Sequence, residues 1–212
     1  METLGKLFGS ESRVKILRLF LFNSGAAFRA DEIAERSKAN LYTVKHEIKL
    51  LRKIGFIKPK ACKKPKKRGT KIAVGVAKGW TLEERFAYLL PLRNLLLGTV
   101  LLSDEEIYQR FAGAGKLKVV IVAGIFTQNM ESRLDLLIAG EQLKKLAIEN
   151  TVKKLEAELG KELTYAAFDL AELNYRVKMY DRLLRDIMEN PHRTLLDKIG
   201  FEGKFTEGTK TK

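Results

Sequence analysis

Apolar residues between positions 10 and 55 recur at intervals of three and four, which is typical of helices with one buried face. The first predicted helix follows a cap at Ser10–Ser12 and stops at residues 23–25, Asn-Ser-Gly. Its apolar residues are Val14, Ile16, Leu17, Leu19, Phe20 and Leu21. A second helix is predicted over residues 32–37 behind an Asp31 cap, and a third from Leu41 to Lys53, ended by Gly55. On the third, Leu41, Val44, Ile48 and Leu51 share one face.

The pattern changes to extended segments after the third helix. Phe56 and Ile57 begin one strand, and residues 72–76 form a second β-branched run. Between them lies a basic loop over residues 58–71 that contains Pro59, Pro65 and Gly69. Two strands around such a loop predict a hairpin, and residues 27–29 predict a short additional strand.

The remainder of the chain mixes helices with short strands. Residues 81–111 predict helix, broken near Pro91 and restarted by a capping sequence at Ser103. Residues 118–123, 134–138 and 163–168 predict strands, and residues 141–159 and 169–189 predict helices. These elements predict an α+β protein with four parts: a DNA-binding domain over 1–80, a helical connector over 81–115, a small α/β domain over 116–200 and a flexible tail over 201–212.

Charge is divided unevenly along the chain. The protein has 212 residues and a net charge of +14, from 40 Lys and Arg and 26 Asp and Glu. The first 80 residues hold 20 of the basic and 6 of the acidic residues, so they carry the whole excess, and the rest is neutral. A basic module joined to a neutral one predicts a polyanionic partner for the first part. A basic domain without any partner is the alternative.

Cysteine usage and the apolar stretches of the chain indicate in which cellular compartment to expect the protein. Cys62 is the single cysteine, so the sequence predicts no internal disulfide, no multi-cysteine metal site and no cofactor. The N-terminus lacks the apolar core of a signal peptide, and the apolar stretch at 88–102 is interrupted by Pro91 and Arg93. We therefore expect a cytoplasmic protein without a membrane partner.

Four segments resemble winged helix-turn-helix regulators of the arsenic-repressor type. Residues 9–17 are similar to the first helix of that family, and residues 31–36 and 42–51 are similar to its helix-turn-helix. Residues 51–57 resemble the passage from the recognition helix into the wing. The resemblance covers residues 4–76 and implies a transcriptional regulator that binds double-stranded DNA.

The polar face of the third helix and the basic hairpin supply the expected DNA contacts. A helix enters the major groove when its outward face carries donors and its inward face is apolar. The candidate residues are Asn40, Tyr42, Thr43, Lys45, His46, Lys49, Arg52, Lys63, Lys64, Lys66, Lys67, Arg68 and Lys71. The residues up to His46 are expected to meet bases or phosphates, and Lys49 and Arg52 the phosphate backbone. The basic residues of the hairpin are expected to lie along a phosphate strand or to reach the minor groove. A solvated helix face, a disordered basic tail and an RNA-binding patch remain open as alternatives.

The second half resembles a nucleotidyltransferase core that has lost its metal ligands. Residues 119–126 and 132–140 are similar to the two strands that carry the nucleotide and metal site in that superfamily. Members usually have Gly-Ser after the first strand, Asp-x-Asp on the second and a further carboxylate later. Here Ile125 follows Gly124, Arg133 stands in place of the first Asp, and only Asp135 remains, with Asp169 beyond the later strand. We expect no catalysis and no metal here, and we expect Arg133 to pair with Asp135. An ordinary small α/β domain is the alternative.

Three functions remain open from the sequence. The first is a DNA-binding regulator that forms a homodimer through residues 88–102, with a protein partner or a small ligand at the C-terminal domain. The second is an active nucleotidyltransferase with a DNA-targeting module. The third is an antitoxin-like protein that binds a partner.

Overall fold

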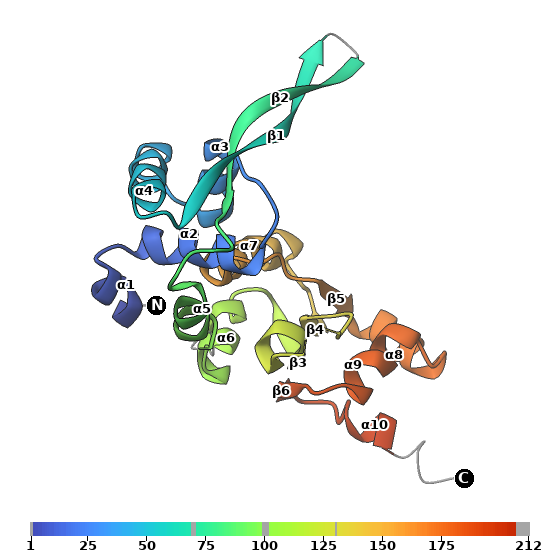
Figure 1. The fold of residues 1–212 in the computed structure, drawn as a ribbon. Helices are drawn as coiled ribbons and strands as arrows, with labels where there is room; N and C mark the ends of the chain where they lie inside the picture. The colour runs from blue at the N-terminus through green and yellow to red at the C-terminus, as the bar shows by residue number, and fades with distance from the viewer. Residues whose placement is uncertain (1, 69–70, 99–101, 130, 207–212) are drawn as a thin grey trace. The chain divides into compact units, whose positions relative to one another are not determined.

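The protein is an α+β molecule with two small sheets (Figure 1). Its computed structural model describes residues 2–68, 71–98, 102–129 and 131–206, and within these the side chains of residues 2, 63–68, 71–74 and 206 lie outside the description. Backbone contacts divide the chain into two compact units. Unit 1 comprises Met1–Val100 with Lys153–Lys161, and unit 2 comprises Leu101–Val152 with Glu162–Lys212.

Unit 1 is built from helices followed by a long hairpin. Its elements are α1 (Glu2–Phe8), α2 (Glu11–Phe22), α3 (Ala30–Ser37), α4 (Leu41–Lys53), β1 (Ile57–Arg68), β2 (Lys71–Leu82) and α5 (Leu89–Gly98). The three helices predicted between residues 10 and 55 are confirmed, and the third has the predicted bounds. The Ser10 hydroxyl caps α2 by accepting a hydrogen bond from the Arg13 amide at 3.2 Å.

The predicted Asp31 cap of α3 is wrong. Arg29 is the N-cap residue, and the Glu32 carboxylate accepts a hydrogen bond from the Arg29 amide at 2.8 Å. Asp31 lies in the first turn and accepts a hydrogen bond from Arg29 Nε at 3.0 Å. The helix therefore starts two residues earlier than predicted, at Ala30, because the Glu32 carboxylate is the hydrogen-bond acceptor for the Arg29 amide.

The hairpin is longer than the sequence pattern indicates. β1 and β2 pair antiparallel over 12 residues each, from Ile57 opposite Leu82 to Arg68 opposite Lys71. The basic run expected as a loop therefore lies within the strands. At the base of the hairpin, Phe28 and Trp80 exchange two backbone hydrogen bonds of 2.9 Å. This is a single β-bridge, so the short strand predicted over residues 27–29 is reduced to one paired residue.

The core of unit 1 joins α2 to every other helix of the bundle. Its buried residues are Val14, Ile16, Leu17, Leu19, Phe20, Leu21, Phe28, Ile33, Val44, Ile48, Leu51, Phe56, Ile57, Trp80, Leu82 and Leu96. Pro91 lies in the first turn of α5, where a missing amide proton costs no helical hydrogen bond. Residues 83–88, which were expected as helix, form turns instead.

A buried arginine connects α2 to the ends of two other helices in unit 1. Arg18 is 4% exposed, and it donates to the carbonyls of Leu96 and Glu158 at 3.0 Å each. Burial lowers the pKa of its guanidinium. Beside it, Gly160 has a φ of +78°, and a Cβ added there would lie 2.5 Å from the backbone of Arg18 and Leu19. The chain after α7 (Lys145–Leu159) thus packs directly on the α2 backbone.

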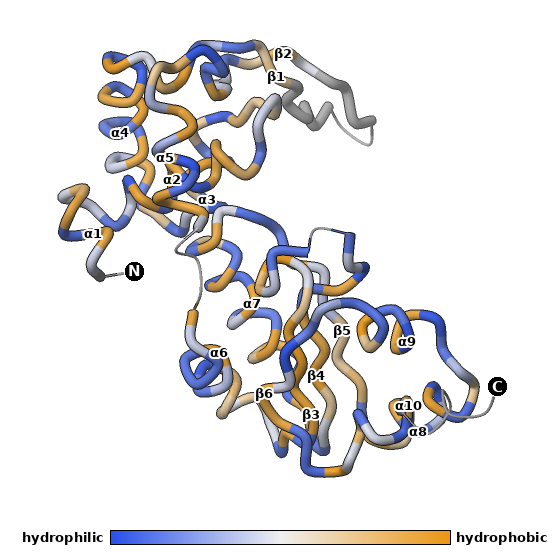
Figure 2. Tube along the Cα trace, turned by 60° about the horizontal axis from the view of Figure 1, so that its bottom comes forward, coloured by the Kyte–Doolittle hydropathy of each residue, from blue (hydrophilic) through white to orange (hydrophobic). Residues whose placement is uncertain are grey.

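Unit 2 contains a four-stranded sheet in the order β5-β4-β3-β6. Its strands are β3 (Lys116–Val122), β4 (Leu136–Glu141), β5 (Tyr165–Asp169) and β6 (Arg193–Asp197). β4 and β5 are parallel, and the other neighbours are antiparallel. Figure 2 shows how apolar residues concentrate in β3 and β4, the two central strands. The remaining elements are α6 (Asp104–Phe111), the 3-10 helix η1 (Gly124–Thr127), α7, α8 (Leu170–Lys178), α9 (Arg182–Glu189) and α10 (Gly203–Thr206).

The three predicted strands of this half are confirmed with shifted ends, but the long helix over 169–189 is wrong. Tyr180 has a left-handed φ of +51°, and the Asp181 carboxylate caps a new helix by accepting from the amides of Leu183 and Leu184. The chain therefore turns between α8 and α9. β6 was not predicted. Beyond β6, Phe201 is fully buried and a short helix runs from Gly203 to Thr206. The flexible tail predicted over residues 201–212 is therefore wrong as far as Thr206, and residues 207–212 lie outside the described part.

Among the described residues, no helix combines the length and the apolarity that crossing a bilayer requires.

Candidate nucleic-acid interface

Helix α4 is held rigidly in unit 1 by its apolar face and by one ion pair. Val44, Ile48 and Leu51 are buried in the core. Glu47, on the same helix, is 3% exposed, and its carboxylate accepts hydrogen bonds from Arg13 Nε at 2.7 Å and Nη2 at 3.2 Å. Arg13 also donates to the carbonyl of Phe8 at 2.7 Å. This pairing joins α2 and α4, so the outward face of α4 has a defined orientation.

That outward face carries the residues predicted to contact DNA. Tyr42 is 83% exposed, and the side chains of Lys45, His46, Lys49 and Arg52 are exposed as well. Within the described part of the chain, none of these four basic side chains forms an ion pair with a carboxylate. Uncompensated cations on an exposed helix face suit a polyanionic ligand.

Two of the predicted contact residues are less available. Thr43 is half-buried. Asn40 is the N-cap of α4, and its side-chain oxygen accepts a hydrogen bond from the Tyr42 amide at 2.8 Å. The cap role explains Asn40 locally without any ligand, because the first amides of a helix lack partners within the helix.

The predicted hairpin contacts fall partly outside the described residues. The backbone of β1 and β2 places them in the paired strands, but their side chains are not described: Lys63, Lys64, Lys66, Lys67, Arg68 and Lys71. Nearer the base of the hairpin, Lys58 pairs with Glu83 at 3.1 Å, and Lys60 donates to the Gly25 carbonyl at 2.9 Å. The basal lysines therefore anchor the hairpin to unit 1.

A groove of about 520 Å³ lies between α4 and β2. It is lined by Ala30, Lys45, Ile48, Lys49, Arg52, Lys53, Lys78 and Trp80. Sequence reasoning missed Lys53, Lys78 and Trp80. Lys45, Lys49 and Lys53 follow one another at intervals of four, a spacing that would have placed all three on one side of the helix. No signal in the sequence indicates that these lysines lie beside Lys78 and Trp80 of β2.

Two residues of the expected nucleotidyltransferase-like site, Gly124 and Asp135, lie in contact, but both carboxylate oxygens of Asp135 accept hydrogen bonds from backbone amides. Asp135 is 5% exposed. Its Oδ1 accepts a hydrogen bond from the Ile125 amide at 2.8 Å, and its Oδ2 accepts one from the Thr164 amide at 2.9 Å. Gly124 has a φ of +54°, and any Cβ there would collide with this carboxylate. Asp135 therefore fastens the turn after β3 to the segment before β5.

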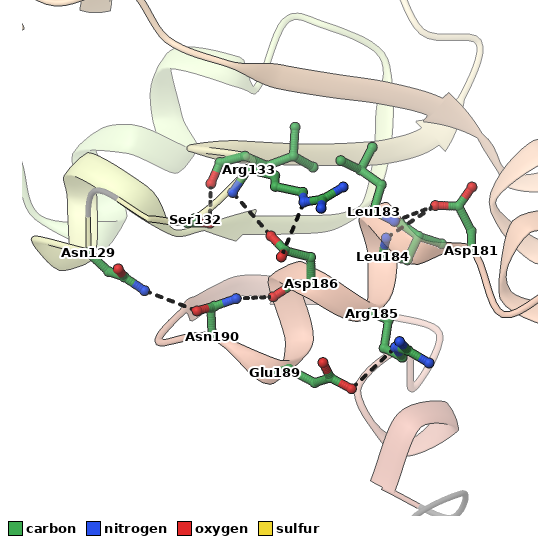
Figure 3. A network of polar contacts seen from close by, with 11 residues as sticks. Asn129, Ser132, Arg133, Asp181, Leu183, Leu184, Arg185, Asp186, Glu189 and Asn190 are labelled. Atoms are coloured by element: carbon green, nitrogen blue, oxygen red, sulfur yellow. Dashed lines mark hydrogen bonds and ion pairs between the residues drawn. The ribbon is translucent and has the colours of Figure 1, made fainter.

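The expected pairing of Arg133 with Asp135 is wrong. Arg133 Nε lies 3.6 Å from Asp186 Oδ1, and the Arg133 amide donates to Asp186 Oδ2 at 3.1 Å (Figure 3). The loop is also joined to α9 by a hydrogen bond between Asn129 and Asn190. Asp135 is buried and both of its carboxylate oxygens accept hydrogen bonds from backbone amides, whereas Arg133 pairs with a carboxylate on α9.

The remaining candidate acid also has a local role. Asp169 caps α8, and its Oδ1 accepts a hydrogen bond from the Glu172 amide at 2.7 Å. In the described ranges, no group of three or more His, Cys, Asp and Glu side chains is arranged to hold a metal ion.

Comparisons of the chain with family models, with curated proteins and with solved structures found no match.

Proposed function

We propose that this protein is a transcriptional regulator that binds double-stranded DNA through a winged helix-turn-helix in unit 1. In this interpretation α3 and α4 are the helix-turn-helix, α4 is the recognition helix and the hairpin β1–β2 is the wing. The order of three helices followed by an antiparallel hairpin supports it, as does the concentration of positive charge in the first 80 residues.

The observation that carries the proposal is the exposed face of α4. Lys45, Lys49 and Arg52 project from it without carboxylate partners among the described residues, while the opposite face is buried. Phosphates would bind these cations and position the helix, and Tyr42 and His46 are exposed near its N-terminus, the part that meets base edges in such domains.

We propose further that unit 2 does not transfer nucleotides and serves in binding a protein partner or a small ligand. Two-metal nucleotidyl transfer requires several converging carboxylates. The hydrogen bonds of Asp135 to two backbone amides and the pairing of Arg133 with Asp186 support a structural role for this site. Incubation with labelled nucleoside triphosphates, Mg²⁺ and DNA should yield no labelled product, and a product that disappears in Asp135→Ala would overturn this part.

The DNA-binding proposal is tested by selecting duplexes from a random pool and measuring their affinity by fluorescence anisotropy. The triple variant Lys45→Gln, Lys49→Gln, Arg52→Gln should weaken binding at least tenfold, because each lost phosphate contact removes a charge-assisted interaction. The matched control, Lys145→Gln, Lys153→Gln, Lys154→Gln, removes the same charge from exposed positions on α7 and should leave affinity within about twofold. Equal losses in the two variants, or no selected duplex, would contradict the proposal.

A further inference from the structure

The groove between α4 and β2 combines an apolar floor with a ring of cations. Ala30, Ile48 and Trp80 supply the apolar surface, and the basic side chains around it are Lys45, Lys49, Arg52, Lys53 and Lys78. Its volume of about 520 Å³ is in the range of small-molecule sites, roughly 300–1,000 Å³.

Two of the cations lie over the aromatic floor. The guanidinium carbon of Arg52 is 6.0 Å from the centroid of the Trp80 ring, and the ammonium nitrogen of Lys78 is 5.0 Å from it. Trp80 itself is buried and is fixed by its two backbone hydrogen bonds to Phe28. The base of the hairpin and α4 therefore position the apolar floor and the two cations without a bound ligand.

The positive charge in the groove is uncompensated within the described part of the chain. None of the five cations has an ion pair with a described carboxylate, and no acidic side chain is among the described residues that line the groove. Five like charges around one apolar surface repel one another, and an anion placed between them relieves that repulsion.

We propose that this groove binds a small aromatic acid, a planar apolar body that carries a carboxylate, sulfonate or phosphate group. The ring of such a ligand covers Ile48 and the accessible edge of Trp80, and its anionic group lies among the lysines. A DNA strand reaches the cations at the rim, but its phosphates offer no apolar surface to the floor. The aromatic acid matches both parts of the groove.

Binding of the acid and binding of DNA exclude each other. Lys45, Lys49 and Arg52 line the groove and also belong to the DNA-contacting face of α4, so a bound anion occupies cations that the phosphates need. This consequence rests on the proposed function, and it makes the groove an effector site at which an aromatic acid releases the protein from DNA.

The chain contains a single tryptophan, Trp80, and six tyrosines, so fluorescence excited at the red edge of the absorption band, where tyrosine absorbs little, comes from Trp80. We would titrate the full chain with 8-anilinonaphthalene-1-sulfonate, and with neutral N-phenyl-1-naphthylamine as the uncharged counterpart. The sulfonate should change the Trp80 emission saturably, and the neutral compound should bind at least tenfold more weakly. Lys53→Gln and Lys78→Gln should each weaken sulfonate binding several-fold to about tenfold, in line with loss of one charge-assisted contact. Lys145→Gln is the control and should have no effect.

Each measurement has an outcome that would contradict the proposal. A Trp80 signal that does not saturate, equal binding of the neutral compound, or unchanged affinity in both groove variants would overturn the site. Far-ultraviolet circular dichroism of each variant confirms that the fold is intact. Release of a labelled duplex by the sulfonate, at concentrations that saturate the Trp80 signal, supports the effector role, and undisturbed DNA binding at saturation would overturn it. Failure to bind any duplex would remove the proposed function and the competition together, whereas the Trp80 titration decides the acid site independently of DNA.

Discussion

Single residues fix the orientation of α4, the helix proposed to contact DNA, and the Arg13–Glu47 pair is the most specific of them. Glu47 is 3% exposed and Arg13 is 25% exposed, so removing the carboxylate leaves a partly buried guanidinium without its partner. We expect Glu47→Ala to lower the free energy of unfolding by about 3 kcal/mol. Urea unfolding measures this, and Glu35→Ala, an exposed acid on α3, should cost at most about 0.5 kcal/mol. A similar effect of both changes would mean that the pair does not hold α4.

Gly160 is the second position at which one residue decides local packing. Its φ is +78°, and an added Cβ meets the backbone of Arg18 and Leu19 at 2.5 Å. Gly160→Ala should therefore destabilise unit 1 by about 3 kcal/mol, from backbone strain and overpacking together. Gly25 also has a positive φ, +87°, but open space around it, so Gly25→Ala isolates the strain and should cost about 1 kcal/mol. Thermal unfolding of both variants compares them, and equal losses would exclude the close contact with α2.

At the scale of elements, the hairpin β1–β2 determines how far unit 1 reaches. Twelve residues in each strand give a length of roughly 40 Å, which exceeds the roughly 12 Å width of a major groove. A basic hairpin of this length is suited to follow a phosphate backbone beyond the site of α4. The described hairpin residues that line the groove are Lys78 and Trp80. We therefore expect substitutions at Lys63, Lys64, Lys66, Lys67 and Arg68 to change DNA affinity without changing the proposed binding of the aromatic acid.

The hairpin makes a quantitative prediction about salt. Replacing Lys63, Lys64, Lys66, Lys67 and Arg68 by Gln should weaken binding to all duplexes. The slope of log affinity against log salt should fall by about 0.9 for every phosphate contact that is lost. Anisotropy titrations at four or more salt concentrations measure the slope. An unchanged slope would remove the hairpin from the interface. A variant with five Lys→Gln changes at exposed positions outside the hairpin controls for net charge: Lys144, Lys145, Lys153, Lys154 and Lys178.

At the scale of the whole molecule, a single recognition helix reads few base pairs, so we expect a homodimer on DNA. The described part of the predicted seam retains exposed apolar side chains. Tyr88 and Leu90 are each 67% exposed, and Leu95 is 40% exposed, whereas Leu96 is buried in the core. Residues 99–101 of the same stretch lie outside the described part. The helix α5 thus buries one face in its own unit, and we expect its exposed apolar face to contact a second copy.

Sedimentation velocity at micromolar concentration tests this expectation. The unmodified chain should sediment as a dimer in the presence of DNA, and Leu90→Glu should shift it to a monomer because a charge would be buried in the seam. Glu84→Gln, at an exposed position just before α5, is the control and should leave the dimer intact. A monomer with and without DNA would exclude the homodimer.

The sequence by itself determined the local elements of this protein. Helical spacing of apolar residues located α2, α3 and α4, and continuous or nearly continuous apolar runs located β3 and β4, because burial of one face or of both faces leaves its period in the chain. Caps at Ser10 and Ser103 were readable for the same reason, since the partner of a cap lies three residues away.

Only the tertiary structure decided which distant residues meet. Lys78 and Trp80 reach the α4 groove because β2 returns antiparallel to β1, and Arg133 meets Asp186, 53 residues further on, because α9 lies beside its loop. β6 has no distinctive pattern and pairs with β3 only once the sheet exists. Periodicity records whether a side chain is buried but not what it is buried against. The groove, the hydrogen bonds of Asp135 to two backbone amides and the close contact at Gly160 therefore follow from tertiary packing, which the short-range pattern of the sequence does not record.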